Sequence, residues 1–406
     1  MPHILFVHLR FPEYDRCSGD LRLTNMLRIL SQHHKITLHI LYKPAEFLGQ
    51  PDNKKYIGIM QELGIEVRTG SLRSSLRHKD YDLVLIEFWY LARHLFEDIR
   101  ALRPNARIAV DTEHVYFYSD QLKAKAFGQD VQSAKLNNNK REELSTYAKA
   151  DLVITTTEED KAVLLAENSS LRIATVPNIH QIHAQNDSDF AKRKQNSLIF
   201  VGNFSNNPSN IDAMVYFCGQ VLPLIRHRFP SISLAIVGNK PPPEVQALAC
   251  DHVTVTGYVP DVEPYLASSM VSICPLRYGA GLKGKIGEAM MHGLPVVTTS
   301  IGTQGMNARI GVDILVGDSP EEFSNCVAKL LQQAELWKAL SKNGQDLVIR
   351  GYSFETVGER ISGIMSELNK IPIKRYGQAK RLAVKSRLDV ADFLQRQVLW
   401  RIRRSA

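Results

Sequence analysis

The stretch PLRYGAGLKGKIGEAMMHGLPVVTT, residues 275–299, carries the clearest structural signal in the chain. It follows the apolar run Val271 to Cys274, and it predicts a buried strand, a glycine-rich loop, a helix and a second strand that begins at Pro295. Glycines let such a loop turn tightly and bring its backbone N–H groups close to a ligand. The glycines concerned are Gly279, Gly281 and Gly284.

The charged side chains of this stretch favour an anion site. Lys283 and Lys285 stand where the helix begins, and a helix N-terminus already attracts anions. Glu288 lies about one turn beyond Lys285, on a similar face. This order suits a sugar nucleotide, with the diphosphate in the loop and the ribose hydroxyls at the carboxylate. An ordinary strand–loop–helix unit with packing glycines and solvated lysines gives the same local pattern, and it stays open at this point.

The composition is that of a globular protein of two ordinary domains, with 406 residues, 44% hydrophobic and 23% charged. We find neither an apolar run long enough to cross a bilayer nor a basic-then-apolar leader, and we expect a cytoplasmic protein. Its five cysteines are odd in number and widely spaced, which favours reduced thiols over disulfides or a zinc site.

The positive charge is concentrated in the tail. Residues 371–406 hold 10 basic and 2 acidic side chains, so their net charge equals the +8 of the whole chain. The tail predicts a basic helix with ragged amphipathicity that contains Phe393 and Trp400, and an anionic membrane surface at the inner face of the membrane is one partner that it suits. A solvated or protein-contacting extension stays open. We expect no nucleic-acid partner, because no basic motif is interleaved with aromatic residues.

Short apolar strands alternate with helical stretches, which predicts parallel sheets flanked by helices. We expect strands at 3–9, 36–42, 65–68, 82–87, 107–111, 151–155, 171–176, 197–203, 234–238, 253–258, 271–274 and 312–316. We expect helices at 20–32, 55–63, 90–101, 136–149, 158–166, 319–343 and 354–368. The polar segment 178–195 reads as a linker, and its Asp187-Ser188-Asp189 triplet reads as a solvated hinge rather than a metal site.

Several motifs together resemble glycosyltransferase family 4, the retaining group 1 enzymes with the GT-B fold. They are HILFVHLRFP (3–12) with SGDLR (18–22), VDTEHV (110–115), ADLVITTTEEDK (150–161), VPNIH (176–180), FVGNFSNNPSNIDA (200–213), AIVGNKPP (235–242), the run 255–299 and GTQGM (302–306). The resemblance implies an α/β fold of two Rossmann-like domains that face each other across a cleft. It implies an acceptor-side domain at 1–178 with a crossover helix at about 354–370, a nucleotide-sugar domain at 195–350 and the basic tail at 371–406.

The resemblance also implies an activity. It implies metal-independent, retaining transfer of a sugar from a donor such as a UDP- or GDP-sugar to a glycan or lipid-linked acceptor, in the synthesis of cell-surface polysaccharide or glycoconjugates. It requires no separate cofactor. Two other functions stay open on the same fold: a sugar-nucleotide epimerase or hydrolase, and an inactive nucleotide-sugar-binding subunit at the membrane.

The motifs assign candidate site residues. The catalytic candidates are His114, Glu113 and Lys285. The candidates for binding the nucleotide sugar are Gly19, Gly202, Asn203, Tyr258, Val259, Arg277, Gly279, Gly281, Leu282, Lys285 and Glu288.

Two departures from the family pattern matter. Ala280 stands where many members have a glutamate that holds the transferred sugar, so other groups must hold it here. The loop NFSNNPSN lacks the arginine and lysine of many members, and Arg277 with Lys285 are the expected substitutes at the diphosphate.

Overall fold

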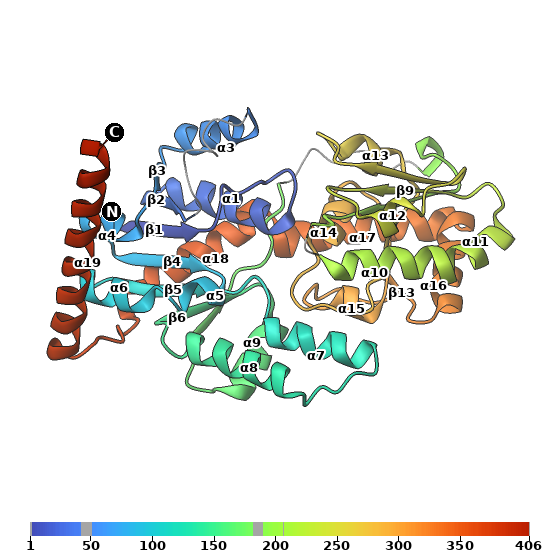
Figure 1. Ribbon diagram of the computed structural model, residues 1–406. Coiled ribbons are helices and arrows are strands. Elements are labelled where there is room, and N and C mark those ends of the chain that lie inside the picture. Colours follow the sequence, from blue (N-terminus) through green and yellow to red (C-terminus); the bar gives the residue numbers. More distant parts are fainter. Residues whose placement is uncertain (1, 42–50, 182–189, 206, 406) are drawn as a thin grey trace.

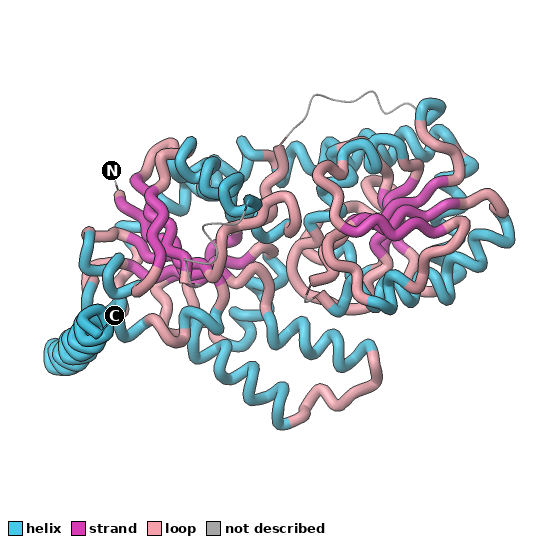
Figure 2. The backbone as a smooth tube through the Cα atoms, turned by 45° about the horizontal axis from the view of Figure 1, so that its top comes forward, coloured by secondary structure: helices cyan, strands magenta, loops and turns pink. Residues whose placement is uncertain are grey.

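The computed structural model describes residues 2–41, 51–181, 190–205 and 207–405, so the Asp187–Asp189 triplet, with the rest of 182–189 in the expected linker, lies outside the described residues. Two α/β domains lie side by side, each with its own parallel sheet (Figures 1 and 2). The expected fold class, two Rossmann-like domains that face each other across a cleft, is confirmed.

The first domain is built on seven parallel strands in the order β3-β2-β1-β4-β5-β6-β7. Residues 4–8 of the central strand β1 are buried, as expected for a strand covered by helices on both faces. The strands are β1 (His3–His8), β2 (Lys35–Ile40), β3 (Glu66–Thr69), β4 (Leu83–Glu87), β5 (Arg107–Asp111), β6 (Leu152–Thr155) and β7 (Ile173–Thr175).

Helices cover both faces of this sheet, and α7 and α8 form a helical arm that extends below it in Figure 1. The helices of the first domain are α1 (Ser18–Ser31), α3 (Pro51–Glu62), α4 (Leu72–His78), α5 (Trp89–Ala92), α6 (Phe96–Leu102), α7 (Tyr116–Ala126), α8 (Ala134–Tyr147) and α9 (Glu158–Glu167).

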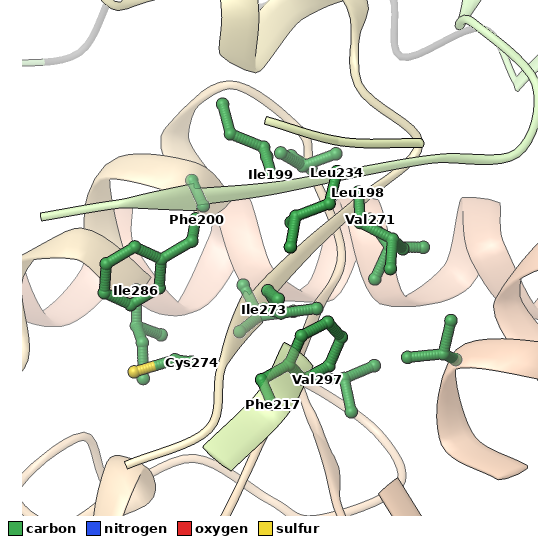
Figure 3. Packing of buried hydrophobic residues seen from close by; sticks show 14 of the residues in the cluster. Leu198, Ile199, Phe200, Phe217, Leu234, Val271, Ile273, Cys274, Ile286 and Val297 are labelled. Carbon is green, nitrogen blue, oxygen red and sulfur yellow. The ribbon is translucent and has the colours of Figure 1, made fainter. Parts of the chain in front are cut away.

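The second domain has six parallel strands in the order β10-β9-β8-β11-β12-β13. Figure 3 shows its core, where Phe200 of β8 lies on the same face of the sheet as Ile273 of β11 and near Ile286 of the helix that follows the glycine loop. Ile199 of β8 is buried on the opposite face. The strands are β8 (Ser197–Val201), β9 (Ser233–Val237), β10 (Val253–Gly257), β11 (Val271–Cys274), β12 (Val296–Thr298) and β13 (Leu315–Val316).

The helices of the second domain complete this core. The indole N–H of Trp337 donates a hydrogen bond of 2.7 Å to the carbonyl of Met270. The helices are η1 (Phe190–Lys192), α10 (Pro208–Tyr216), η2 (Phe217–Val221), α11 (Leu222–Arg228), α12 (Pro243–Gln246), α13 (Glu263–Ser268), α14 (Gly284–Met291), α15 (Ser300–Thr303), α16 (Pro320–Gln332) and α17 (Ala334–Tyr352).

The chain then returns to the first domain through α18 (Phe354–Glu367) and η3 (Leu368–Lys370). At the crossing, the N–H of His180 donates to Tyr352 (2.8 Å) and the N–H of Phe354 donates to His180 (3.0 Å), so the outgoing and returning chains are hydrogen-bonded to each other. Val357 and Ile361 of α18 are buried in the core of the first domain. The two domains therefore share one helical connection beside the cleft.

The basic tail forms α19 (Gln378–Ser405), which packs against α6 at the end of the first domain that is remote from the second (Figure 1). Val384 and Leu388 are buried in the core of the first domain. Asp389 pairs with Arg77 of α4 at 2.6 Å. Among the described residues, no helix is both long and apolar enough to cross a membrane.

Two expectations in the second half were wrong in detail. The strand expected at 312–316 is only the pair Leu315–Val316, because Asp313 accepts hydrogen bonds from the backbone and side chain of Arg309 and closes a turn there. The helix expected at 319–343 is two helices, which meet at Gln333.

Two helices of the first domain, α4 and α7, were not predicted. Their apolar periodicity is weak, and neither N-cap residue caps its helix with a side chain. Tertiary contacts therefore define these helices more than local sequence does.

Candidate active site

A cavity of about 730 Å³ lies between the domains, where the carboxyl ends of both parallel sheets meet. Open α/β sheets bind ligands at this edge because their loops and helix N-termini converge there. Except for Arg277, every candidate residue from the sequence lines this cavity. They are Gly19, Glu113, His114, Gly202, Asn203, Tyr258, Val259, Gly279, Gly281, Leu282, Lys285 and Glu288.

Two lysines at the start of α14 form the cationic part of the second-domain wall. The ammonium of Lys283 donates to the carbonyls of Gly281 (2.7 Å) and Gly279 (3.2 Å), so it also holds the glycine loop together. Lys285 donates to the side-chain carbonyl of Asn210, and its Nζ lies 4.3 Å from the centroid of the Phe200 ring. Burial lowers the pKa of Lys283 to about 8 and also lowers the pKa of Lys285, because the charged form loses hydration. An anion in the cavity would favour both charged forms.

Glu288 lies one turn further along α14 and also lines the cavity. Burial raises the pKa of its carboxyl to about 7, because the charged carboxylate is poorly hydrated there. Hydroxyl donors from a ligand would favour the ionised form. The arrangement thus pairs a cationic end with an acceptor group about one helical turn away, as the sequence predicted.

The glycine loop has a second role that the sequence did not indicate. Gly281 has a φ of 75°, and a Cβ there would lie 2.8 Å from the Cβ of His114 in the other domain. A Cβ at Gly284 would lie 2.7 Å from the Cβ of Ser18. Real Cβ atoms do not approach other atoms so closely. These two glycines therefore let the start of α14 touch the first domain directly, in addition to any approach to a ligand.

His114 belongs to the first-domain wall. Its ring stacks on Tyr116, with 4.1 Å between the ring centroids and 26° between the planes. Burial, with a smaller contribution from Lys283, lowers the pKa of His114 to about 4, so its imidazole is neutral near pH 7. A neutral imidazole can donate one hydrogen bond to a sugar hydroxyl or to a phosphate oxygen.

Glu113 lies beside His114 and connects the cavity to a buried network. Its φ is 52°, and its carboxyl fills the space that a side chain at residue 19 would need, which accounts for Gly19. Burial and the nearby Glu87 carboxylate raise the pKa of Glu113 well above its ordinary value. Glu87 lies 2.8 Å from Nε2 of His8. Burial and Glu87 therefore favour the protonated form of the Glu113 carboxyl, and the Glu87 carboxylate is placed to accept its hydrogen bond.

A buried ion pair lies behind the same wall. Arg22 of α1 donates to Asp111 at the end of β5 (2.8 Å) and to the carbonyl of Val176 (2.9 and 3.0 Å). The two charged side chains are 1% and 2% exposed. The pair thus joins the end of β5 to Val176, the residue after the last strand of the first domain. It thereby also positions Glu113 and His114, which follow β5.

One rim of the cavity is closed by a contact between the domains. The hydroxyl of Tyr258 donates to Asp15 (2.8 Å), which also accepts from Tyr56 (2.7 Å) and Lys55 (2.9 Å). The guanidinium of Arg16 lies 4.9 Å from the Tyr258 ring centroid. Tyr258 was predicted as a nucleotide contact or a packing residue at a strand end, and here it joins the two domains.

Arg277 does not lie where the sequence placed it. Its guanidinium forms a bidentate pair with Asp212, at 2.9 Å for Nε, and lies over the rings of Phe127 and Tyr216. Phe127 of the first domain in turn contacts Tyr278, with 5.5 Å between centroids. A carboxylate and two aromatic rings thus satisfy Arg277 outside the cavity lining, whereas Lys285 lies in it.

Other residues that line the cavity were absent from the predicted set. The sequence placed Lys283 as a cation at the start of the helix, but it was not among the candidate site residues. Several others lie within the motifs that carried the resemblance, such as Asn210 in 200–213 and Asn239 in 235–242, while the rest are scattered along the chain. The additional lining residues include Arg16, Arg22, Tyr116, Ser119, Asp120, Asn178, His180, Asn210, Asn239 and Lys283.

Comparison with known proteins gives a family match for the second domain. Residues 195–333, the glycine-loop domain, match the family described as glycosyl transferases group 1. A stretch of 170 residues, 40% of this chain, is 22% identical to an uncharacterised 44.6 kDa protein of the cps region in Klebsiella pneumoniae. The match spans 44% of the length of that relative.

The whole fold is shared with solved structures. HepE from Anabaena, solved in complex with UDP-glucose, aligns over 90% of this chain and 100% of its own, at 13% identity and a TM-score of 0.67. Sucrose-phosphate synthase from Thermosynechococcus elongatus aligns over 92% of this chain and 100% of its own, at 15% identity and a TM-score of 0.64. The fold is therefore the GT-B fold.

Proposed function

We propose that this protein is a glycosyltransferase that moves a sugar from a nucleotide diphosphate to a glycan or lipid-linked acceptor. The observation that carries the proposal is the placement of Lys283, Lys285 and Glu288 on α14, facing His114 and Glu113 across one cavity. The match to group 1 glycosyltransferases and the UDP-glucose complex of HepE support it.

The geometry suggests how such a transfer would be catalysed. The bond from the anomeric carbon to the phosphate oxygen breaks, a bond to the acceptor oxygen forms, and the acceptor hydroxyl gives its proton to the departing diphosphate. Until that proton arrives, negative charge builds on the diphosphate, where Lys283, Lys285 and the N-terminus of α14 would stabilise it electrostatically. His114 would donate a hydrogen bond from the other wall, where the Glu113 carboxyl lies beside it. We infer that the reaction is retaining and needs no metal, as the resemblance to family 4 implies.

Nucleotide binding is the direct test. Calorimetric titration of the protein with UDP, GDP and ADP should give saturable binding of one of them, and the corresponding sugar nucleotides should then be assayed for turnover. If none of the three binds, the proposal is wrong. Turnover of donor alone to a free sugar or an epimer, with no transfer to any glycan or lipid-linked acceptor, would favour a hydrolase or epimerase. Binding without any turnover would favour an inactive nucleotide-sugar-binding subunit.

We also propose a cytoplasmic enzyme that meets its acceptor at the inner face of the membrane, in the synthesis of a cell-surface polysaccharide. The tail supports this proposal, because both acidic residues of α19 form ion pairs with arginines of the first domain. Its acidic charges are therefore already neutralised by the protein. Leu382 and Val390 remain 52% and 55% exposed between basic residues. A cationic helix with exposed apolar residues suits an anionic bilayer.

Vesicle flotation tests the tail. The protein should float with vesicles that contain phosphatidylglycerol and not with neutral phosphatidylcholine vesicles. A variant that carries Lys380→Glu, Arg381→Glu and Lys385→Glu should stay at the bottom of the gradient. Flotation of that variant at the wild-type level would rule out a membrane role for this helix.

A further inference from the structure

The arm formed by α7 and α8 contains a buried carboxylate that neither the sequence motifs nor the proposed reaction explains. Glu143 of α8 is 0% exposed. Its two oxygens accept the backbone N–H groups of Tyr116 (2.9 Å) and Phe117 (2.8 Å), the first residues of α7. The hydroxyl of Tyr147, also 0% exposed, donates to the same carboxylate at 2.8 Å.

The position of this carboxylate compensates for a missing cap. A helix begins with N–H groups that have no partner within the helix, and Ser, Thr, Asp or Asn usually caps them. The residue before α7 is Val115, whose side chain cannot accept a hydrogen bond. Glu143 supplies the cap from another helix, and its negative charge also suits the positive end of the helix dipole.

The first turn of α7, which Glu143 caps, forms part of the first-domain wall of the cavity. Tyr116, whose N–H group Glu143 holds, stacks on His114 with 4.1 Å between the ring centroids, and both line the cavity. Tyr116 is also packed edge-on against Tyr90 at 5.8 Å. If the first turn of α7 moved, Tyr116 and His114 would move with it.

We propose that Glu143 is a positioning residue, which caps α7 and thereby fixes the Tyr116–His114 pair at the catalytic cavity. The inference rests on the proposed glycosyl transfer. Glu143 itself does not line the cavity, so its effect on the reaction passes through the backbone of Tyr116 and the rest of α7. Burial raises the pKa of Glu143 to about 7, which makes this cap sensitive to pH near neutrality. The charged or titratable groups around it are Tyr116 and Asp120 on α7, Lys140 and Tyr147 on α8, and Asp160 on α9.

Hydrogen–deuterium exchange tests the cap without any activity assay. Glu143→Gln keeps the shape of the side chain, but its NH2 group then faces one of the two backbone N–H groups. We expect backbone hydrogen exchange in residues 112–127 to become about 2- to 30-fold faster, which corresponds to the loss of a helix cap. Glu142→Gln, on the exposed side of the same helix, is the matched control and should leave exchange unchanged. Unchanged exchange in Glu143→Gln and in Glu143→Ala would overturn the cap.

Kinetics test the positioning role. With the sugar nucleotide that the parent protein hydrolyses or transfers, Glu143→Gln should lower kcat by about 10- to 100-fold through misplaced groups, while the affinity for the free nucleotide stays the same. Glu143→Asp, which keeps the charge, should recover part of kcat. The parent should lose kcat below pH about 7 as the carboxylate is protonated, and Glu143→Gln should lack this dependence.

The outcomes separate the inference from the proposed function. Faster exchange with unchanged kcat would overturn the positioning role and leave only a structural cap. A parent protein that binds and turns over no sugar nucleotide would contradict the proposed function instead, and the exchange result would still report on the cap. If Glu143→Ala fails to fold, the near-isosteric Glu143→Gln variant still decides both points.

Discussion

The two walls of the cavity are built by different physical means. The second-domain wall is made of consecutive residues, a glycine loop and the first turns of α14, with Lys283, Lys285 and Glu288 in the cavity. The first-domain wall rests on buried pairs between distant parts of the chain. Arg22 and Asp111 are 89 residues apart, and the His8–Glu87 pair connects β1 with β4.

This difference separates binding from stability. A wall whose charges face a cavity can change its ligand affinity with little cost to folding. A wall whose charges are paired and buried loses stability when one partner is removed, because the other charge is left without compensation. We therefore expect substitutions in the second-domain wall to weaken nucleotide binding first, and those in the first-domain wall to weaken folding first.

Breaking the buried pair should have the largest effect. Asp111→Ala leaves the Arg22 guanidinium buried without its carboxylate, and we expect the free energy of unfolding to fall by about 3–5 kcal/mol. Denaturant unfolding followed by circular dichroism measures this. The affinity for the nucleotide that the parent binds should fall by less than the stability does, since Asp111 lies outside the cavity lining, although Arg22 lies in it.

An exposed Asp–Arg pair provides the control. Asp80, 99% exposed, pairs with Arg103 at 3.3 Å, so Asp80→Ala should cost about 0–1 kcal/mol. If Asp111→Ala reduced nucleotide affinity more than it reduced stability, the proposed division between the walls would be wrong.

Lys285→Ala should have the next largest effect, but on turnover rather than on stability. Loss of one preorganised cation at the diphosphate should reduce turnover by about 10²–10³-fold, or about 2.7–4 kcal/mol, with the midpoint of unfolding nearly unchanged. Steady-state kinetics and calorimetric binding measure it. Lys338→Ala, a lysine in an exposed pair on α17, is the control. Wild-type turnover in Lys285→Ala would exclude the predicted role at the leaving group.

The same contrast explains what the sequence could predict. The motif at 275–299 placed a strand, a loop and a helix because its glycines and charges are consecutive, and the alternation of strands and helices predicted both parallel sheets. Sequence reasoning could not foresee that Arg277 lies outside the cavity lining, because Asp212 and the rings of Phe127 and Tyr216, far away in sequence, hold its side chain. The cap of α7 by Glu143 was missed for the same reason: the two segments meet only in the folded chain.

The pH dependence of nucleotide binding tests the role of Glu288 in the second-domain wall. Burial raises the pKa of Glu288 to about 7, so the carboxylate that would accept ribose hydroxyls is ionised at pH 8 and mostly protonated at pH 6. We expect the affinity of the parent for its nucleotide to fall by about tenfold, or about 1.4 kcal/mol, over this range.

Protonation of the nucleotide phosphate also contributes in this range, so the comparison is made between variants. Glu288→Gln should bind more weakly at pH 8 and lose the part of the pH dependence that belongs to the carboxyl group. Glu335→Gln, at an exposed site on α17, should follow the parent. The same slope in Glu288→Gln and in the parent would remove Glu288 from the binding site.

The smallest effect is expected where the two walls meet, at the rim contact of Tyr258 with Asp15. Tyr258→Phe removes one hydrogen bond at a partly exposed site but keeps the ring beside Arg16, and it should weaken nucleotide binding by only about 0.5–1.5 kcal/mol. Asp15→Ala also removes the partner of Tyr56 and Lys55, so its effect should be larger. Small-angle scattering should show more open domains in both variants. Equal effects of the two variants would mean that only the Tyr258 hydroxyl matters at this rim, whereas no effect of either would mean that the contact at the glycine loop, where Gly281 meets His114, is sufficient to hold the walls together.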